Sequence, residues 1–152
     1  MEQSILNEYG IIGSLLIDAT LFPEASGLSE DDFTLVPLRE VFRAMRRQFS
    51  ENGGFDALTV RAEAGQHCPE VTDKLLLESM EITPTTANLT VYVSDVKEAS
   101  LSRKLAVLGN ELVSSGRTPA EALSHARTVI QELAEDGGAG EATTVADALN
   151  AL

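Results

Sequence analysis

The sequence predicts an all-α protein: a compact helical bundle, followed by an antiparallel two-helix hairpin and a linker segment. Apolar residues recur three and four positions apart along most of the 152 residues, as they do on one face of a helix. Residues that cap helices precede several of these segments, and no segment alternates with the period of two that strands show. We therefore expect a globular helical part over 1–82, a hairpin over 83–135, and a flexible linker with the start of another helix over 136–152.

The first helix is expected over residues 3–18. Four apolar residues, spaced four, three and four apart, would form one apolar face: Ile5, Tyr9, Ile12 and Leu16. Gly13 is a poor helix former that is tolerated where another backbone must come close. Residues 20–29 contain a proline and a glycine and indicate a connector with short apolar segments. Residues 29–33 (Ser-Glu-Asp-Asp-Phe) then predict a capped turn, with acids near a helical N-terminus.

A second helix is predicted from Pro37, a favoured first-turn proline, to about Phe49. Asn52, Gly53 and Gly54 would end it, because these residues accept a positive φ. One side of this helix is apolar, and the other carries four arginines: Arg39, Arg43, Arg46 and Arg47. The arginines indicate a solvated face or a contact with an acidic partner, in preference to a DNA-binding face.

Two shorter helices are expected next. Asp56 would cap a helix that reaches about Glu63, and Gly65 to Pro69 would break the chain. A further helix is expected over residues 70–81.

The hairpin begins with a long helix that starts at 83–86 (Thr-Pro-Thr-Thr) and reaches about Val113. Thr118-Pro-Ala-Glu121 forms a capping box with proline at the first helical position, and opens the second helix. Each helix has a coiled-coil-like apolar seam, and a link this short makes the pair antiparallel. The seams comprise Leu89, Val93, Val96, Leu101, Leu105, Leu108 and Leu112 in the first helix, and Leu123, Ala126, Ile130 and Leu133 in the second. Val107, Val113 and Val129 flank them, and such surplus apolar surface usually marks a subunit contact.

The glycine-rich stretch 136–140 indicates a flexible linker, and Thr144 could cap a last helix over 145–152. That helix would end uncapped on Ala-Leu, as if it were cut short or bound to something else.

The charge balance limits the function. The chain has 24 acidic and 11 basic residues and a net charge of −13, so we expect no direct DNA binding and no adhesion to an anionic membrane. All the cations lie between Arg39 and Arg127. One cysteine, no apolar run of about 18 residues and no basic N-terminal region are typical of a cytoplasmic protein.

No pattern predicts catalysis, so we expect no enzyme activity, cofactor or metal. None of the three lysines follows a glycine as a P-loop requires. His67 and Cys68 are adjacent ligand types, but neighbours on a loop rarely reach one ion. The acidic pairs at 31–32 and 135–136 are typical of solvated capping carboxylates.

Five landmarks in a characteristic order are similar to the N-terminal domain of replicative DNA helicases of the DnaB type. They are Asn7–Asp18, Asp32–Phe33, Val41–Met45, Asp56–Val60 and Thr83–Asn88, followed by Tyr92, Val96, Lys97 and Arg103. The last landmark resembles the family's Thr-Pro-Ser-Ala-Ala-Asn, which precedes a long helix. The chain departs from the family at Leu38, usually histidine, at Tyr9, usually glutamine, and over 65–77.

The resemblance implies a scaffold without the ATPase half. In the family, hairpins of adjacent subunits pair, three such dimers form a collar on the hexameric motor, and primase, loader proteins or phage factors dock there. It implies a homodimer through the hairpin, with Leu101, Leu105, Leu108, Leu112 and Ile130 on the seam and pairing surface and Arg103, Lys104 and Arg127 beside it. The alternative is a free-standing phage or mobile-element regulator that mimics the collar and binds the host helicase or primase.

Overall fold

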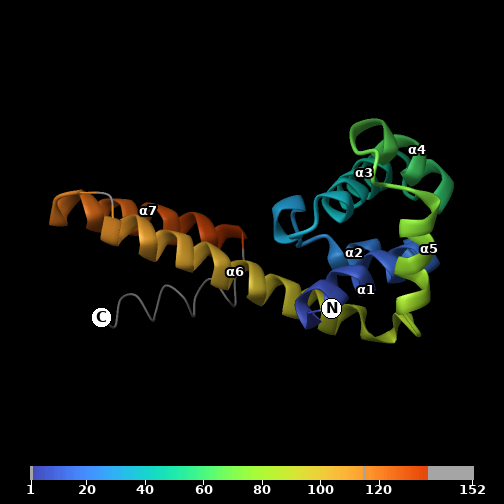
Figure 1. Cartoon of the computed structure of the whole chain (residues 1–152), viewed down its shortest axis with the longest axis horizontal. Coiled ribbons are helices and arrows are strands. Elements are labelled where there is room, and N and C mark those ends of the chain that lie inside the picture. Colours follow the sequence, from blue (N-terminus) through green and yellow to red (C-terminus); the bar gives the residue numbers. More distant parts are fainter. Residues whose placement is uncertain (1, 115, 137–152) are drawn as a thin grey trace. The chain divides into compact units, whose positions relative to one another are not determined.

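The computed structural model describes residues 2–114 and 116–136, and every regular element in these residues is a helix (Figure 1). The predicted all-α fold is confirmed. The chain divides into two compact units, residues 1–99 and residues 100–152, which are considered separately below. The unit boundary falls inside one long helix, whereas the division predicted from the sequence, at residues 82 and 135, stays a prediction.

The first unit contains most of the helices. They are α1 (Gln3–Ile17), η1 (Ala19–Leu21), α2 (Phe22–Ala25), η2 (Glu30–Asp32), α3 (Val36–Asn52), α4 (Ala57–His67), α5 (Asp73–Ile82), η3 (Thr86–Asn88) and the first part of α6 (Leu89–Ser114). The second unit holds the rest of α6 and α7 (Pro119–Asp136).

Local sequence signals set the ends of several helices. Gly53 ends α3 with φ of 75° and donates its N–H to the Phe49 carbonyl at 2.8 Å. Asp56 caps α4 by accepting a hydrogen bond from the Thr59 N–H at 2.8 Å, and the Thr59 hydroxyl accepts one from the Asp56 N–H at 3.1 Å. Both signals were predicted, and both are confirmed.

Several boundaries differ from the prediction. The helix α3 continues past Phe49 to Asn52, and α5 begins at Asp73, after its N-cap Thr72, and not at residue 70. The helix α4 does not end near Glu63 but continues through Gly65 to His67, because the cost of one helical glycine, about 1 kcal/mol, is offset where the next turn buries Ala64 and Cys68. The connector after α1 contains the short helix α2, whose Phe22 is buried. The long helix begins at Leu89, after a separate 3-10 turn, and not at Thr83.

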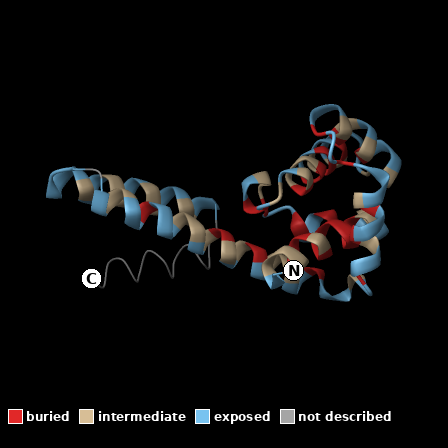
Figure 2. Ribbon diagram, viewed as in Figure 1, coloured by how far each residue is buried: buried red, intermediate tan, exposed pale blue. Residues whose placement is uncertain are grey.

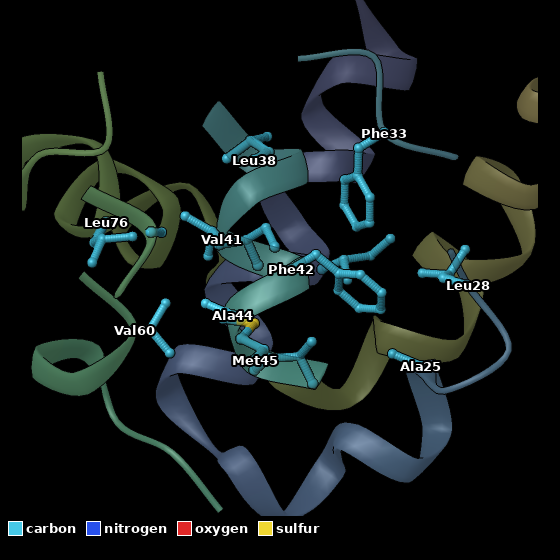
Figure 3. Packing of buried hydrophobic residues seen from close by; sticks show 14 of the residues in the cluster. Ala25, Leu28, Phe33, Leu38, Val41, Phe42, Ala44, Met45, Val60 and Leu76 are labelled. Carbon is cyan, nitrogen blue, oxygen red and sulfur yellow. The ribbon is translucent and has the colours of Figure 1, made fainter. Parts of the chain in front are cut away.

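The core of the first unit lies between α1 and α3. Residues Ile11, Ile12 and Leu15 of α1 are fully buried. The apolar residues along one side of α3 are buried too, and Figure 3 shows Leu38, Val41 and Phe42 among them, while Figure 2 shows buried positions along both helices. The rings of Phe33 and Phe42 lie 5.0 Å apart within this cluster. The central helices are therefore held by contacts made through the whole unit, not by their own propensities.

The helices α1 and α5 approach each other closely at Gly13. A side chain at this position would overlap the Ser79 carbonyl oxygen and the Thr83 hydroxyl, so only glycine fits. The close backbone approach expected at Gly13 is confirmed.

A buried carboxylate joins α1 to the start of α3. Glu8 is 1% exposed and accepts hydrogen bonds from the Thr34 N–H at 2.8 Å, the Thr34 hydroxyl at 2.7 Å and the Leu35 N–H at 3.4 Å. Leu35 is the N-cap residue of α3, so the Glu8 carboxylate fixes the turn that leads into this helix.

The linker and the last helix predicted over 136–152 lie, except for Asp136, outside the described residues. Within the described part, no single helix is long and apolar enough to cross a membrane. The segments Gln3–Ile17 and Ala19–Ala25 are long and apolar enough only when they are taken together, and the chain bends by 119° between them.

Candidate interaction surfaces

The second unit is a hairpin of two packed helices, formed by α7 and the part of α6 from Ser100 on. Thr118 opens α7 with the predicted capping box. Its hydroxyl accepts from the Glu121 N–H at 3.2 Å, and the Glu121 carboxylate accepts from the Thr118 N–H at 3.4 Å. Near the connection, His125 Nε2 of α7 lies 2.7 Å from Glu111 Oε2 of α6, which joins the two helices by a side-chain contact.

The hairpin buries little of its apolar surface. Leu108, 5% exposed, is the only buried hydrophobic residue among the described residues of the second unit, and no residue of α7 is buried. Leu105, which the sequence places on the seam, is 39% exposed. Leu123, which was expected on the seam of α7, is 59% exposed, so the expectation that the two helices enclose these two seam residues is wrong. Two helices alone cannot enclose an apolar stripe of this width.

The other predicted interface residues take intermediate or exposed positions. Five are half-buried: Leu101, Arg103, Lys104 and Leu112 of α6, and Ile130 of α7. Arg127 is exposed. Their role in an interface stays a prediction.

Several of the half-buried and exposed apolar residues fall on one side of the hairpin; Val107 and Val113, which are 57% and 89% exposed, are not among them. At 3.6 residues per turn, Leu105 and Leu112 of α6 lie on the same side as Leu123 and Ile130 of the antiparallel α7. Gly109 lies on the same side of α6. Apart from its chain neighbours and the backbone of its own helix, no atom lies within 4 Å of the place that a Cβ would occupy there. We call this side, made up of Leu101, Leu105, Gly109, Leu112, Leu123 and Ile130, the apolar face. The opposite side carries Arg103, Val107, His125 and Glu132, so it is more polar.

A second surface lies in the first unit, over α3 and α4. The arginines of α3 are paired with glutamates there. Arg43 Nη1 donates to both carboxylate oxygens of Glu40, at 3.0 and 3.1 Å. Arg47 Nη1 donates to Glu51 at 2.6 Å, and its Nε donates to Glu63 of α4 at 2.8 Å. Sequence spacing could reveal the Glu40 and Glu51 pairs, whereas the Glu63 partner depends on how α4 folds back.

Arg47 holds the pKa of the Glu63 carboxyl below its ordinary value, mainly by hydrogen bonding, against the opposing effect of burial. The ionised carboxylate therefore contributes stability that is present above the ordinary glutamate pKa, about 4.3, and is lost as pH falls through the lower pKa of the folded state. We expect Glu63→Gln to reduce the loss of stability between pH 6 and pH 3, as measured by urea unfolding at each pH. A pH dependence identical to that of the original protein would contradict this assignment.

The described residues contain no group of three or more His, Cys, Asp and Glu side chains that could hold a metal ion. Cys68 is buried, and its thiol donates a hydrogen bond to Glu70 at 3.0 Å. Burial, followed by the Glu70 interaction, raises the pKa of this thiol, which favours the unreactive protonated form.

Comparisons with known proteins agree with this fold. A family model, the DnaB-like helicase N terminal domain, matches residues 1–98. The chain is 31% identical over 120 residues to the replicative DNA helicase DnaB of Geobacillus stearothermophilus, which covers 76% of this chain and 26% of that protein. It is 28% identical over 123 residues to replicative DNA helicase DnaB of Buchnera aphidicola, which covers 78% of this chain and 27% of that protein. The chain thus spans about a quarter of the length of these relatives.

A solved structure extends the match into the hairpin. The crystal structure of the N-terminal domain of DnaB helicase from Mycobacterium tuberculosis superposes with a TM-score of 0.73 at 25% identity, and covers 84% of this chain and 95% of that one. The family model, the two relatives and the fold all identify the same domain. The chain therefore belongs to the family of DnaB-like helicase N-terminal domains.

Proposed function

We propose that this chain is a non-catalytic collar domain that holds subunits of a replicative helicase together through its hairpin and docks primase or a loader protein. The observation that carries the proposal is the apolar face, which the hairpin itself leaves uncovered. The membership of the DnaB-like family supports it, because the relatives are replicative helicases by name.

A second copy of the chain is the occupant that fits the apolar face. The face is formed by two antiparallel helices, and an identical pair offers the same residue types at the same spacing. Gly109 leaves the backbone of α6 open, so a neighbouring helix can approach closely between Leu105 and Leu112. Pairing would cover side chains that are otherwise held in water.

The test is self-association measured by analytical ultracentrifugation. We expect a concentration-dependent dimer, and we expect Leu105→Glu to raise the dissociation constant at least about tenfold, or about 1.4 kcal/mol, because it places a charge in a desolvated contact. Leu108 is unsuitable for this test, since its burial means that a charge there would disrupt the hairpin itself.

Val107→Glu is the matched control. Val107 is on the same helix and is 57% exposed, but it lies on the side opposite the apolar face. It should leave the dissociation constant unchanged. A protein that stays monomeric at millimolar concentration, or equal effects of the two substitutions, would overturn the pairing proposal.

Docking of primase is tested separately by isothermal titration calorimetry with the primase of the same organism. We expect saturable binding to the dimer. Binding to neither primase nor a helicase loader would leave only the oligomerisation role.

A further inference from the structure

The two helices of the hairpin carry the same pattern on the apolar face. Each has three residues on this side, spaced four and three apart: Leu105, Gly109 and Leu112 in α6, and Leu123, Arg127 and Ile130 in α7. Residues at this spacing are neighbours on one side of a helix. Arg127 therefore takes the place on α7 that Gly109 takes on α6.

A side-chain contact shows how the two patterns line up along the hairpin. His125 Nε2 lies 2.7 Å from Glu111 Oε2, so these two residues are at the same level of α7 and α6. Because the helices are antiparallel, each residue forward in α7 corresponds to one residue back in α6. Arg127 comes two residues after His125, and Gly109 two residues before Glu111, so Arg127 and Gly109 share one level.

At this level the apolar face has an open place on one helix and a long side chain on the other. Gly109 is exposed, and a methyl group there would meet no atom within 4 Å beyond its chain neighbours and the backbone of its own helix. Arg127 is exposed too, and it has no ion-pair partner within residues 2–114 and 116–136. By helical spacing, the described carboxylates of the second unit fall on other sides of α6 and α7. Nothing in the described hairpin therefore neutralises Arg127 or fills the place at Gly109.

We propose that α6 of each copy packs on α7 of the other when two hairpins pair, with Arg127 of one copy lying over Gly109 of the second copy. This inference rests on the proposed function, because it presupposes that the hairpins pair through their apolar faces. A two-fold axis that runs along the hairpin gives this arrangement. Symmetry then sets each α6 residue against the α7 residue of its own level, so the register of the hairpin also fixes the register of the dimer.

The fit between the two faces supports this arrangement. The side chain of Arg127 fills the open place at Gly109, and it does so twice, once in each direction. Its alkyl part covers the open backbone of α6, while the guanidinium group stays in water at the edge of the contact. The apolar residues on either side of this point also meet at matching levels, Leu105 with Ile130 and Leu112 with Leu123. The contact therefore encloses apolar side chains without burying a charge.

The other symmetric arrangement packs α6 on α6 and α7 on α7. Its two-fold axis crosses the hairpin, and it is centred near Gly109 if Leu105 of one copy is to meet Leu112 of the other. Two open places would then face each other and leave a gap, which forfeits packing contacts. Two copies of Arg127 would also face each other, and like charges in a contact cost free energy. In the proposed arrangement the two arginines lie on different helices, roughly one interhelical distance of 8–10 Å apart, where salt screens part of their repulsion.

A substitution at Gly109 distinguishes the two arrangements by the direction of its effect on pairing. Leucine there would occupy the place of Arg127 in the proposed dimer. We therefore expect Gly109→Leu to raise the dissociation constant at least about tenfold in analytical ultracentrifugation of the full chain. If α6 packs on α6, the two leucines fill the gap and the dissociation constant falls. An unchanged or lower dissociation constant would overturn the proposal.

Two further variants separate a clash in the contact from a change in the hairpin itself. Adding Arg127→Ala to Gly109→Leu should restore most of the lost affinity, because it makes room for the leucine across the contact. Asn110→Leu adds the same side chain at the next position, which is exposed and lies off the apolar face, and it should pair like the original protein. Failure of Arg127→Ala to rescue pairing, or an equal effect of Asn110→Leu, would contradict the contact.

Disulfide formation tests the contact directly. We expect a mixture of the Gly109→Cys chain and a tagged Arg127→Cys chain to form a disulfide-linked heterodimer under mild oxidation, and each chain alone to form much less. The native Cys68 is buried, so the original protein provides the background. Disulfides within each single variant and none between the two, or no disulfide in the mixture although the dimer persists, would overturn this inference alone. Absence of any dimer in the ultracentrifuge would instead overturn the pairing itself, and this inference with it.

Discussion

We expect Gly13→Ala to lower the free energy of unfolding by about 3 kcal/mol or more. The added methyl group would overlap the carbonyl oxygen of Ser79 and the hydroxyl of Thr83. The hydroxyl cannot easily turn away, because it donates a hydrogen bond to that same carbonyl at 2.8 Å. The helices α1 and α5 would have to separate, and this would loosen the core around Ile12.

Urea unfolding followed by circular dichroism measures this loss, and Gly27→Ala is its control. Gly27 is exposed and does not have a positive φ, and a methyl group there would have no atom within 4 Å apart from its chain neighbours. Alanine there should change the unfolding free energy by less than about 0.5 kcal/mol. Equal stabilities of the two variants would show that α1 and α5 are not in close contact at Gly13.

Gly10 gives an intermediate case within the same helix. A Cβ there would lie 2.8 Å from the ring of Tyr92. A ring can tilt more easily than a backbone carbonyl can move, so Gly10→Ala should cost less than Gly13→Ala, about 1 kcal/mol. The order of the three glycine variants thus tests the packing around α1 in detail.

Much of this fold could be predicted from local signals. Pro37, Gly53, Asp56 and the Thr118 capping box each act within a few residues of the helix end they define. The prediction that Gly65 ends α4 is wrong, because the end of this helix is not decided locally. The cost of the glycine is local, but what outweighs it, the burial of Ala64 and Cys68, depends on the rest of the unit.

The candidate surfaces were predictable only in part. The spacing of the leucines indicated the hairpin, but a periodic pattern does not tell which apolar residues the partner helix reaches, so Leu123 was misplaced. The arginines of α3 were visible in the sequence, and so was Glu40. The pairing of Arg46 with Glu30 and of Arg47 with Glu63 spans 16 residues in each case, and requires the tertiary fold.

The burial of Glu8 is the clearest case of a side-chain environment that the sequence alone does not predict. Residues 1–38 contain seven acids and no base, a pattern typical of solvated surface charges. The sequence gives no signal that separates the two buried acids, Glu8 and Asp32, from the five others. Glu8 is buried against the turn before α3. A carboxylate can be buried without a cation where several N–H and O–H donors converge on it.

We expect Glu8→Ala to lower the free energy of unfolding by about 3 kcal/mol, because it leaves the N–H groups of Thr34 and Leu35 without their acceptor and creates a cavity. Glu8→Gln keeps the shape and one carbonyl oxygen, so it should cost less than Glu8→Ala. Urea unfolding of both variants measures the difference.

The direction of the stability change distinguishes the loss of these hydrogen bonds from a general effect of the net charge of the chain. Removing one negative charge from a chain of net charge −13 should by itself stabilise the compact state slightly, because it lowers self-repulsion. Glu81→Ala, at an exposed position of α5, tests that effect alone, and it should leave the stability unchanged or a little higher. If Glu8→Ala behaved like Glu81→Ala, the carboxylate would not be the acceptor that anchors α3 to α1. A loss confined to Glu8→Ala would show that hydrogen bonding outweighs charge repulsion at this position.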